Sequence, residues 1–228
     1  MYLFGALRSV GKWAGDLVLI ANALDKDQIF EFERRGIIVE TTCDNPYYAK
    51  YNIFSSSLRY WDRLCYMDQD FVIYRDVNKL FEQQSDFLAD IDGTQRIRDQ
   101  FTGDILGYDC SQPAFISSCM LFDTKAINQD DNGTVHALQA LTEEYKEKNK
   151  HNGTGTDQPI LNLYFSDVWK QINGVNFVNV LPTRKIARES PDGIIASHTT
   201  RWYKPWDPDF GVYDWYLNGI EHFQGMLC

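Results

Sequence analysis

Two aspartates, Asp68 and Asp70, interrupt an apolar run that otherwise resembles a buried β-strand, RLCYMDQDFVIYRD at residues 63–76. Two bare carboxylates buried together repel each other and lose their hydration, so something must compensate them. Alternate residues of a strand point the same way, ~6.5–7 Å apart at Cα, so both carboxylates can converge on one cation if the strand bends there. Mg²⁺ and Mn²⁺ prefer such oxygen ligands. On the spacing alone, a surface turn with two solvated aspartates is as good an interpretation as a metal site.

A histidine and a lysine lie close together near the C-terminus. His198 follows a short apolar segment and Lys204 comes six residues later, in HTTRWYKPWDP at residues 198–208. An imidazole beside a carboxylate pair supplies a third metal ligand, and a nearby ammonium neutralises phosphate oxygens. The alternative is a polar loop whose aromatic side chains pack on the core.

A third polar group stands at the start of an apolar helical pattern, GTGTDQPILNLYF at residues 153–165. Asp157 suits the N-cap of this helix and Pro159 an early helical position, so capping alone explains both residues.

The elements that must position these residues alternate between strand-like and helix-like patterns, which is typical of a parallel α/β sheet. Glycines and polar loops separate the segments, and no internal repeat occurs. In the first half we expect strands at Tyr2–Leu7, Gly36–Thr41 and residues 64–74, helices at Asp16–Leu24 and Tyr48–Tyr60, and a helical turn at Asp76–Gln83 capped by Asp76. In the second half we expect strands at Ala114–Phe122, Val175–Leu181 and Ile194–His198, and helices at His136–Lys150 and Asp157–Phe165.

Composition narrows the class of protein. The chain has 228 residues and a formal net charge of −10. Because such a negative charge repels polyanions, we do not expect nucleic acid as a partner. No apolar run reaches the roughly 20 residues that a membrane span needs, and no signal peptide is evident, which predicts a cytoplasmic location. The five cysteines are scattered without CxxC spacing, which predicts reduced thiols and argues against a zinc site.

Four segments in order resemble the family 8 glycosyltransferases, the glycogenin and bacterial galactosyltransferase type. The segment at residues 47–81, YYAKYNIFSSSLRYWDRLCYMDQDFVIYRDVNKLF, resembles the family's lysine-bearing helix, its D-x-D strand and the turn that follows. FISSCMLFD, TDQPILN and HTTRWYKPW resemble F-N-S-G-V-M-L-F-N, D-Q-x-x-L-N and H-x-x-G-x-x-K-P-W. The resemblance covers roughly residues 45–206.

The resemblance implies a GT-A-type Rossmann-like fold, a mixed and mostly parallel sheet flanked by helices. It implies one catalytic domain over residues 1–228, with a nucleotide-sugar-binding half at about 1–92 and an acceptor-side half at about 93–228. The chain is compact for this family, which is compatible with one catalytic module of a longer polypeptide. The implied reaction is the transfer of a hexose, with retention, from a UDP-sugar such as UDP-glucose or UDP-galactose to a glycan or glycoprotein acceptor.

The resemblance also implies roles for individual residues. Asp68, Asp70 and His198 would bind Mn²⁺, or Mg²⁺ in its place, and the ion would bridge the diphosphate. A bound cation and a lysine stabilise the charge that develops as a diphosphate departs. Asp157 and Gln158 would lie beside the donor sugar near the reacting carbon. The expected nucleotide-sugar-binding residues are Lys50, Asp68, Gln69, Ser117, Arg201 and Lys204.

The chain departs from the family pattern at three motif positions. Ile116 and Ser118 stand where the family has asparagine and glycine, and Arg201 replaces the glycine of H-x-x-G-x-x-K. These changes affect what the resemblance implies about the donor sugar and the nucleotide base more than what it implies about the class of reaction. Trp13 could stack on a base, although a packing role is the stronger interpretation.

Two other classes of protein remain open. DQDFV also matches the nucleophile loop of haloacid-dehalogenase-like phosphatases, in which Asp68 would attack phosphate and Asp70 would act as the acid. That class needs a later pair of magnesium-binding acids, and Asp130-Asp131 fits poorly. The third class is a non-catalytic nucleotide-sugar-binding module.

Overall fold

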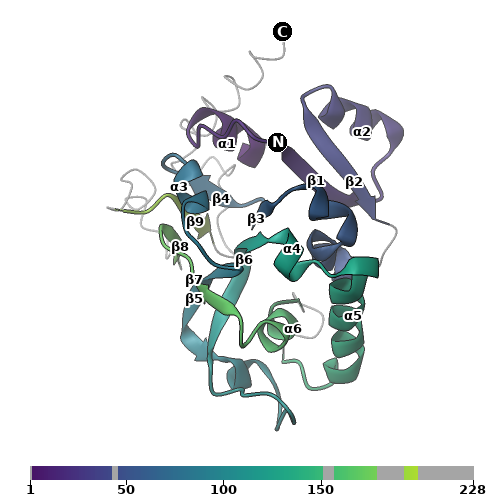
Figure 1. Ribbon diagram of the computed structural model, residues 1–228, viewed down its shortest axis with the longest axis vertical. Coiled ribbons are helices and arrows are strands. Elements are labelled where there is room, and N and C mark those ends of the chain that lie inside the picture. The colour runs from purple at the N-terminus through teal and green to yellow at the C-terminus, as the bar shows by residue number, and fades with distance from the viewer. Residues whose placement is uncertain (1, 43–45, 151–156, 179–192, 200–228) are drawn as a thin grey trace. The chain divides into compact units, whose positions relative to one another are not determined.

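The computed structural model describes residues 2–42, 46–150, 157–178 and 193–199. These residues form a mixed α/β protein whose chain makes two compact units (Figure 1). The first unit comprises Met1–Gly15, Met67–Gln84 and Ile172–Cys228, and the second comprises Asp16–Tyr66 and Ser85–Gln171.

A four-stranded sheet forms the centre of the second unit, in the order β3-β6-β5-β7. Strand β5 pairs antiparallel with β6 and parallel with β7. A separate pair of parallel strands, β1 and β2, is connected by helix α2. The strand bounds are Leu17–Asn22 (β1), Ile37–Thr42 (β2), Arg63–Met67 (β3), Phe87–Arg96 (β5), Pro113–Asp123 (β6) and Trp169–Gln171 (β7).

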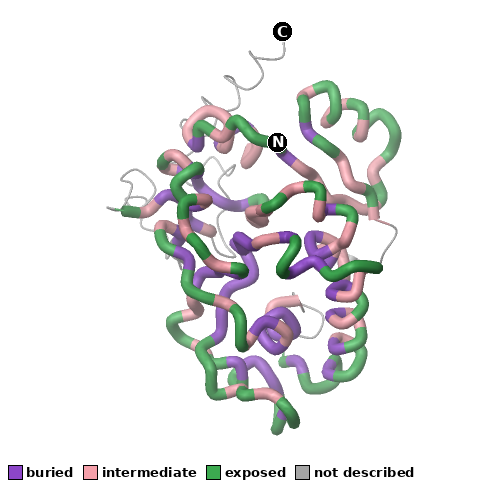
Figure 2. Tube along the Cα trace, viewed as in Figure 1, coloured by how far each residue is buried: buried purple, intermediate pink, exposed green. Residues whose placement is uncertain are grey.

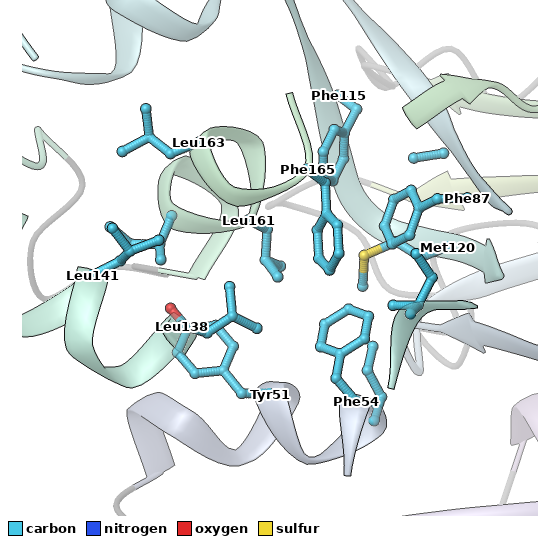
Figure 3. Packing of buried hydrophobic residues seen from close by; sticks show 14 of the residues in the cluster. Tyr51, Phe54, Phe87, Phe115, Met120, Leu138, Leu141, Leu161, Leu163 and Phe165 are labelled. Carbon is cyan, nitrogen blue, oxygen red and sulfur yellow. The ribbon is translucent and has the colours of Figure 1, made fainter. Parts of the chain in front are cut away.

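The hydrophobic core of the second unit is rich in phenylalanine. The ring of Phe87 on β5 stacks on Phe165 with centroids 4.3 Å apart, and Phe54 lies 5.1 Å from both Phe122 and Phe165 (Figure 3). Such ring pairs stabilise a core beyond the area that they bury. Residues 114–122 of strand β6 and Pro159–Leu163 of helix α6 (Asp157–Tyr164) are buried (Figure 2), so the relative position of these two elements is closely fixed by packing.

Short helices accompany this sheet, and several of them contribute buried side chains to the hydrophobic core. Residues 48–60, which we predicted to be one amphipathic α-helix, instead belong to two 3₁₀ helices separated at Ser55. The Ser55 side chain accepts a hydrogen bond from the Ser57 N–H and starts the second of these helices. The helices of this unit are α2 (Lys26–Glu33), η1 (Pro46–Phe54), η2 (Ser56–Tyr60), η3 (Ile97–Gln100), α4 (Thr124–Ile127), η4 (Asp130–Asn132), α5 (Gly133–Tyr145) and α6 (Asp157–Tyr164).

The first unit contains a three-stranded sheet in the order β4-β9-β8. The central strand β9 pairs antiparallel with β4 and parallel with β8. Strand β4 is completely buried, because all of its residues are apolar. The described elements of this unit are α1 (Tyr2–Ser9), β4 (Phe71–Ile73), α3 (Asn78–Phe81), β8 (Val175–Val178) and β9 (Ala196–Thr199).

Two predictions at the N-terminus were wrong. Tyr2–Leu7 is not a strand but part of α1, whose buried Gly5 and Ala6 let the helix pack closely. Asp16–Leu24 is not a helix, because Leu17–Asn22 forms β1 beside β2. A short apolar run is compatible with either structure, and here the parallel partner strand decides.

Most other predicted elements are confirmed with shifted bounds. The expected strand at residues 64–74 is divided into β3 and β4, and the helix at His136–Lys150 is α5 and starts at Gly133. The N-cap position of α3 is Val77 and not the predicted Asp76, although Asp76 accepts hydrogen bonds from Asn78. Strand β5 was missed, because Asp90, Asp92 and Gly93 interrupt its apolar pattern. The segment beyond Val178 in the predicted strand Val175–Leu181 lies outside the described residues.

Three further features bear on the sequence analysis. Among the described residues, no helix combines the length and apolarity that a bilayer crossing requires. Cys65 and Cys110 are free cysteines, and the reduced state of the thiols stays a prediction. The division into nucleotide-sugar and acceptor halves stays a prediction.

Candidate functional site

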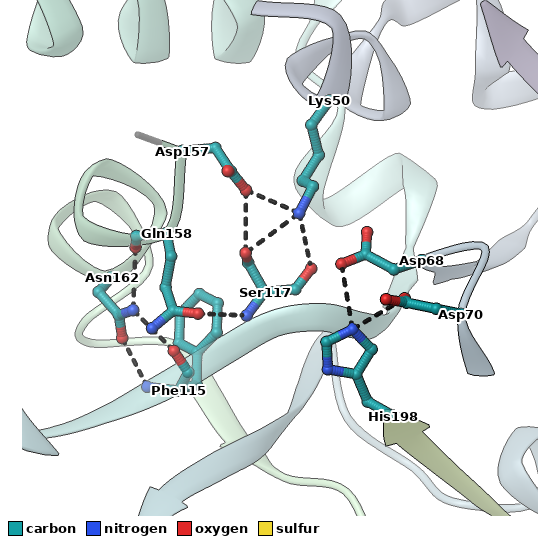
Figure 4. Close-up of polar contacts among 9 residues, drawn as sticks. All are labelled: Lys50, Asp68, Asp70, Phe115, Ser117, Asp157, Gln158, Asn162 and His198. Atoms are coloured by element: carbon teal, nitrogen blue, oxygen red, sulfur yellow. Dashed lines mark hydrogen bonds and ion pairs between the residues drawn. The ribbon is translucent and has the colours of Figure 1, made fainter. Parts of the chain in front are cut away.

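The first polar cluster, in the first unit, joins the two aspartates to His198. Strand β4 pairs with β9 so that Phe71 lies opposite His198, and Asp70 directly precedes Phe71. His198 Nε2 lies 2.9 Å from Asp70 Oδ1 and 3.8 Å from Asp68 Oδ2 (Figure 4). One ligand atom from each of the three side chains lies within 4.8 Å of the others.

The local sequence explains this arrangement. Strand β3 ends at Met67 and β4 begins at Phe71, so the DQD segment forms the turn between them. Apolar residues hold β4 in the interior and leave only the turn polar, and Asp70 is still buried at 7% exposure. The ring of Phe71 lies 5.3 Å from the imidazole of His198 and restricts its position. The expected convergence of Asp68, Asp70 and His198 is therefore present.

Two carboxylates and one imidazole are a donor set that suits Mn²⁺ or Mg²⁺ with additional water or phosphate oxygens. The same side chains come from one turn and one neighbouring strand, so little rearrangement is needed for them to share an ion. The identity of these donor atoms and their closeness to one another are what make the three residues suitable for a divalent cation.

The second polar cluster lies in the second unit and centres on Asp157, the first residue of α6. Lys50 Nζ of η1 lies 2.8 Å from Asp157 Oδ2 and also donates to Ser117 Oγ at 3.2 Å. Ser117 Oγ donates to Asp157 Oδ2 at 2.9 Å, and the Ser117 N–H donates to Gln158 Oε1 at 3.2 Å (Figure 4). The structure thus joins four residues that the sequence analysis had selected from three separate motifs.

The electrostatics of this cluster keep Asp157 ionised. Burial raises the pKa of its carboxyl, but the Lys50 ammonium and the hydrogen bonds from Lys50 and Ser117 outweigh that effect and hold the pKa below its usual value. The Lys50 and Asp157 side chains are only 17% and 16% exposed. Lys50 also lies 5.2 Å from the centre of the Tyr66 ring, which favours a cation. The cluster is a preformed ion pair that remains partly accessible.

A bulge in β6 presents Ser117 to this cluster. Ala89 of β5 pairs with Met120, whereas the next residue, Asp90, pairs with Ile116, so the register shifts at residues 117–119. Bulges re-aim side chains and are common beside active sites. Ile116 and Ser118, the two departures from the family pattern, flank Ser117 and are themselves buried.

The remaining predicted site residues are placed as follows. Gln69 is exposed in the turn between Asp68 and Asp70. Trp13 stacks on Phe81 with ring centroids 4.6 Å apart, in agreement with the packing interpretation. Lys204 and Arg201 lie outside the described residues.

Sequence reasoning missed one polar residue of this region, Asn162. It is fully buried on α6, and its side chain bonds to the backbone of Phe115 on β6. The available signal was its place in TDQPILN, where an asparagine stands within an otherwise apolar helical face.

Comparison with known proteins identifies the class of fold. No family model and no curated protein matches the chain. Solved structures that it resembles are glycosyltransferases, so the chain has the GT-A-type, Rossmann-like fold of nucleotide-sugar transferases that the sequence predicts.

The particular structures share little sequence with this chain. The galactosyltransferase LgtC, solved in complex with donor and acceptor sugar analogs, is 16% identical with a TM-score of 0.65, and the match covers 99% of this chain and 90% of LgtC. The glycosyltransferase GlyE of Streptococcus pneumoniae TIGR4 is 17% identical with a TM-score of 0.62 over 99% of this chain and 60% of GlyE. At these identities the likeness establishes the fold alone.

Proposed function

We propose that this protein is a retaining, Mn²⁺-dependent glycosyltransferase that moves a hexose from a UDP-sugar, such as UDP-glucose or UDP-galactose, to a glycan or glycoprotein acceptor. The observation that carries the proposal is the convergence of Asp68, Asp70 and His198 in a GT-A-type fold. LgtC, whose solved structure this chain resembles, is named as a galactosyltransferase in complex with donor and acceptor sugar analogs, which supports sugar transfer as the reaction class.

In this proposal the first cluster holds the metal and the metal-bound diphosphate. Asp68, Asp70 and His198 supply the protein ligands, and Mg²⁺ can replace Mn²⁺ with the same donor set. The ion would supply positive charge to the diphosphate oxygens as they become the leaving group. Lys204 and Arg201 would add cationic side chains that contact the same phosphate oxygens, and Gln69 would contribute a polar contact from the turn.

The second cluster is assigned to the donor sugar. Asp157 is held ionised by Lys50 and Ser117, so it is ready to accept hydrogen bonds from sugar hydroxyls or to stabilise positive charge at the anomeric carbon. Gln158 is held against the β6 backbone through the Ser117 N–H, which leaves its amide nitrogen to contact the substrate. No side chain is assigned here as a covalent nucleophile.

The experiment that tests the proposal measures release of UDP from UDP-glucose and UDP-galactose, with and without Mn²⁺ and in the absence of an acceptor. We expect slow, metal-dependent hydrolysis by the wild type that is lost in Asp70→Asn and His198→Gln. His136→Gln is the matched control, because His136 is exposed on α5 outside both clusters.

The competing classes of protein give different results in the same assay. Release of phosphate from phosphomonoesters, without UDP release, would favour the phosphatase alternative. Saturable binding of UDP-sugars without any turnover would favour a binding module. A His136→Gln variant that loses as much activity as His198→Gln would contradict the proposed metal ligands.

A further inference from the structure

Asn162 joins helix α6 to strand β6 through its side-chain carboxamide. Its Oδ1 accepts a hydrogen bond from the Phe115 N–H at 2.6 Å, and its Nδ2 donates to the Phe115 carbonyl oxygen at 2.8 Å. The second hydrogen of Nδ2 is directed at the Gln158 carbonyl oxygen, 2.9 Å away and one turn earlier in α6. A fully buried side chain thus uses both donors and its acceptor (Figure 4).

These contacts allow one orientation of the Asn162 carboxamide and one register of α6 along β6. A reversed carboxamide would aim its NH₂ group at the Phe115 N–H and its oxygen at two carbonyl oxygens, so only the observed orientation is stable. The N–H and C=O of one strand residue, and those two residues further on, point to the same edge of the strand. Asn162 at Phe115 and Gln158 at Ser117 therefore supply hydrogen bonds along one edge of β6, as a neighbouring strand would.

The register set by Asn162 reaches the second polar cluster directly. Gln158 lies four residues before Asn162, on the same face of α6, and Asp157 lies one residue further toward the N-terminus. Both of these residues meet Ser117, which is two residues beyond Phe115 in β6. A slip of α6 along β6 would therefore move Asp157 away from both Lys50 and Ser117.

We propose that Asn162 is a positioning residue: its bidentate pairing with the Phe115 backbone holds the start of α6 so that Asp157 and Gln158 keep their places on Ser117 and Lys50. The kinetic consequence rests on the proposed function, because Asp157 and Gln158 are there assigned to the donor sugar. The geometric consequence, the integrity of the Lys50–Asp157 pair, does not depend on that function.

The variant Asn162→Leu tests this role, because leucine has the same number of side-chain heavy atoms as asparagine and the same branch at Cγ but forms none of the three hydrogen bonds. Leu138→Ala is the control for stability, since Leu138 is fully buried in the same core on α5 and has no polar contact with the cluster. Both variants are compared well below their melting temperatures, with folding checked by circular dichroism.

The first readout is kinetic. We expect Asn162→Leu to lower kcat by about 100-fold, as displacement of a reacting group by about 1 Å does, while the KM for the donor changes little because the metal ligands are untouched. Leu138→Ala should retain most of the wild-type kcat. A kcat in Asn162→Leu no lower than in Leu138→Ala would overturn the positioning role.

The second readout is chemical and requires no activity. Acetylation of lysines by an N-hydroxysuccinimide ester, followed by peptide mass spectrometry, reports how often Lys50 leaves Asp157. We expect Lys50 to react several times faster in Asn162→Leu than in the wild type, and Lys125, an exposed lysine, to react equally in all variants.

The two readouts separate the two proposals. A wild type that releases no UDP from any donor refutes the proposed function, and faster labelling of Lys50 in Asn162→Leu then still supports the positioning role. Unchanged labelling of Lys50 refutes the positioning role whether or not the protein is a transferase.

Discussion

Replacing Lys50 by methionine removes the ammonium of the Lys50–Asp157 pair and keeps most of the side-chain volume. The two charges lie 2.8 Å apart, and both side chains are more than four-fifths buried. At an effective dielectric constant of about 20, the direct attraction at this distance is roughly 6 kcal/mol, of which the desolvation of both groups cancels a large part. Breaking such a buried pair leaves the carboxylate without its cation, which costs about 3–5 kcal/mol.

We expect Lys50→Met to lower the free energy of unfolding by about 3 kcal/mol at pH 7, the lower end of that range, because Ser117 Oγ still donates to Asp157. The loss should depend on pH in a definite direction. In the wild type the pKa of Asp157 is depressed, so its stabilising contribution is present above its unfolded value and disappears as the pH falls through the folded value. Without Lys50, we expect burial to raise that pKa instead, so the deficit of the variant should shrink as the pH falls from 7.

Urea denaturation at a series of pH values between 7 and 3.5 measures this difference. Lys125→Met is the matched control, because Lys125 contacts Asp62 at 2.6 Å but both side chains are largely exposed. The control should show no resolvable change, since solvent screens an exposed pair. The reasoning is refuted if the two variants are equally stable at pH 7, or if the deficit of Lys50→Met grows as the pH falls.

Two further predictions concern single residues whose contribution to stability the sequence alone does not reveal. Gly174→Ala should destabilise the first unit by about 2 kcal/mol or more, because Gly174 has φ +83° and an added Cβ would lie 2.8 Å from Ile195 Cδ1. Gly193→Ala, at φ +79° in open space, should cost only about 1 kcal/mol, so equal thermal unfolding of both variants would contradict the steric argument. Asp25→Ala should lower stability by about 1 kcal/mol in urea denaturation, because Asp25 and Gln28 form the capping box of α2, whereas Asp27→Ala should have a smaller effect.

The convergence of Asp68, Asp70 and His198 could be predicted from the sequence to a large extent. Asp68 and Asp70 are acids within an apolar run, and such a conflict between composition and chemistry marks a site. His198 follows a short strand-like segment, which indicated that it stands at the end of a strand. What the sequence could not give is the antiparallel register that sets Phe71 opposite His198, because pairing between strands so distant in the chain has no local signal.

The errors in the fold have similar physical causes. The pattern of Asp16–Leu24 predicts a helix although Leu17–Asn22 is a strand, because a short apolar run does not distinguish a strand from a helix until its partner strand is known. Strand β5 was missed, because its alternation breaks at Asp90 and Gly93, and it is held by its pairing with β6 and β7 rather than by its own propensity. Asn162 was passed over, because an asparagine within an apolar helical face gives no sign of which backbone groups it bonds.

The proposed function requires that His198 and the two aspartates bind one divalent cation. Pulsed electron paramagnetic resonance of the full chain with one equivalent of Mn²⁺ tests it most directly, because a directly bound imidazole nitrogen gives a characteristic coupling to the ion. We predict that the wild type shows this coupling, that His198→Gln loses it, and that Asp70→Asn weakens the binding of Mn²⁺. Binding of Mn²⁺ without any nitrogen coupling, or a coupling that persists in His198→Gln, would contradict the account.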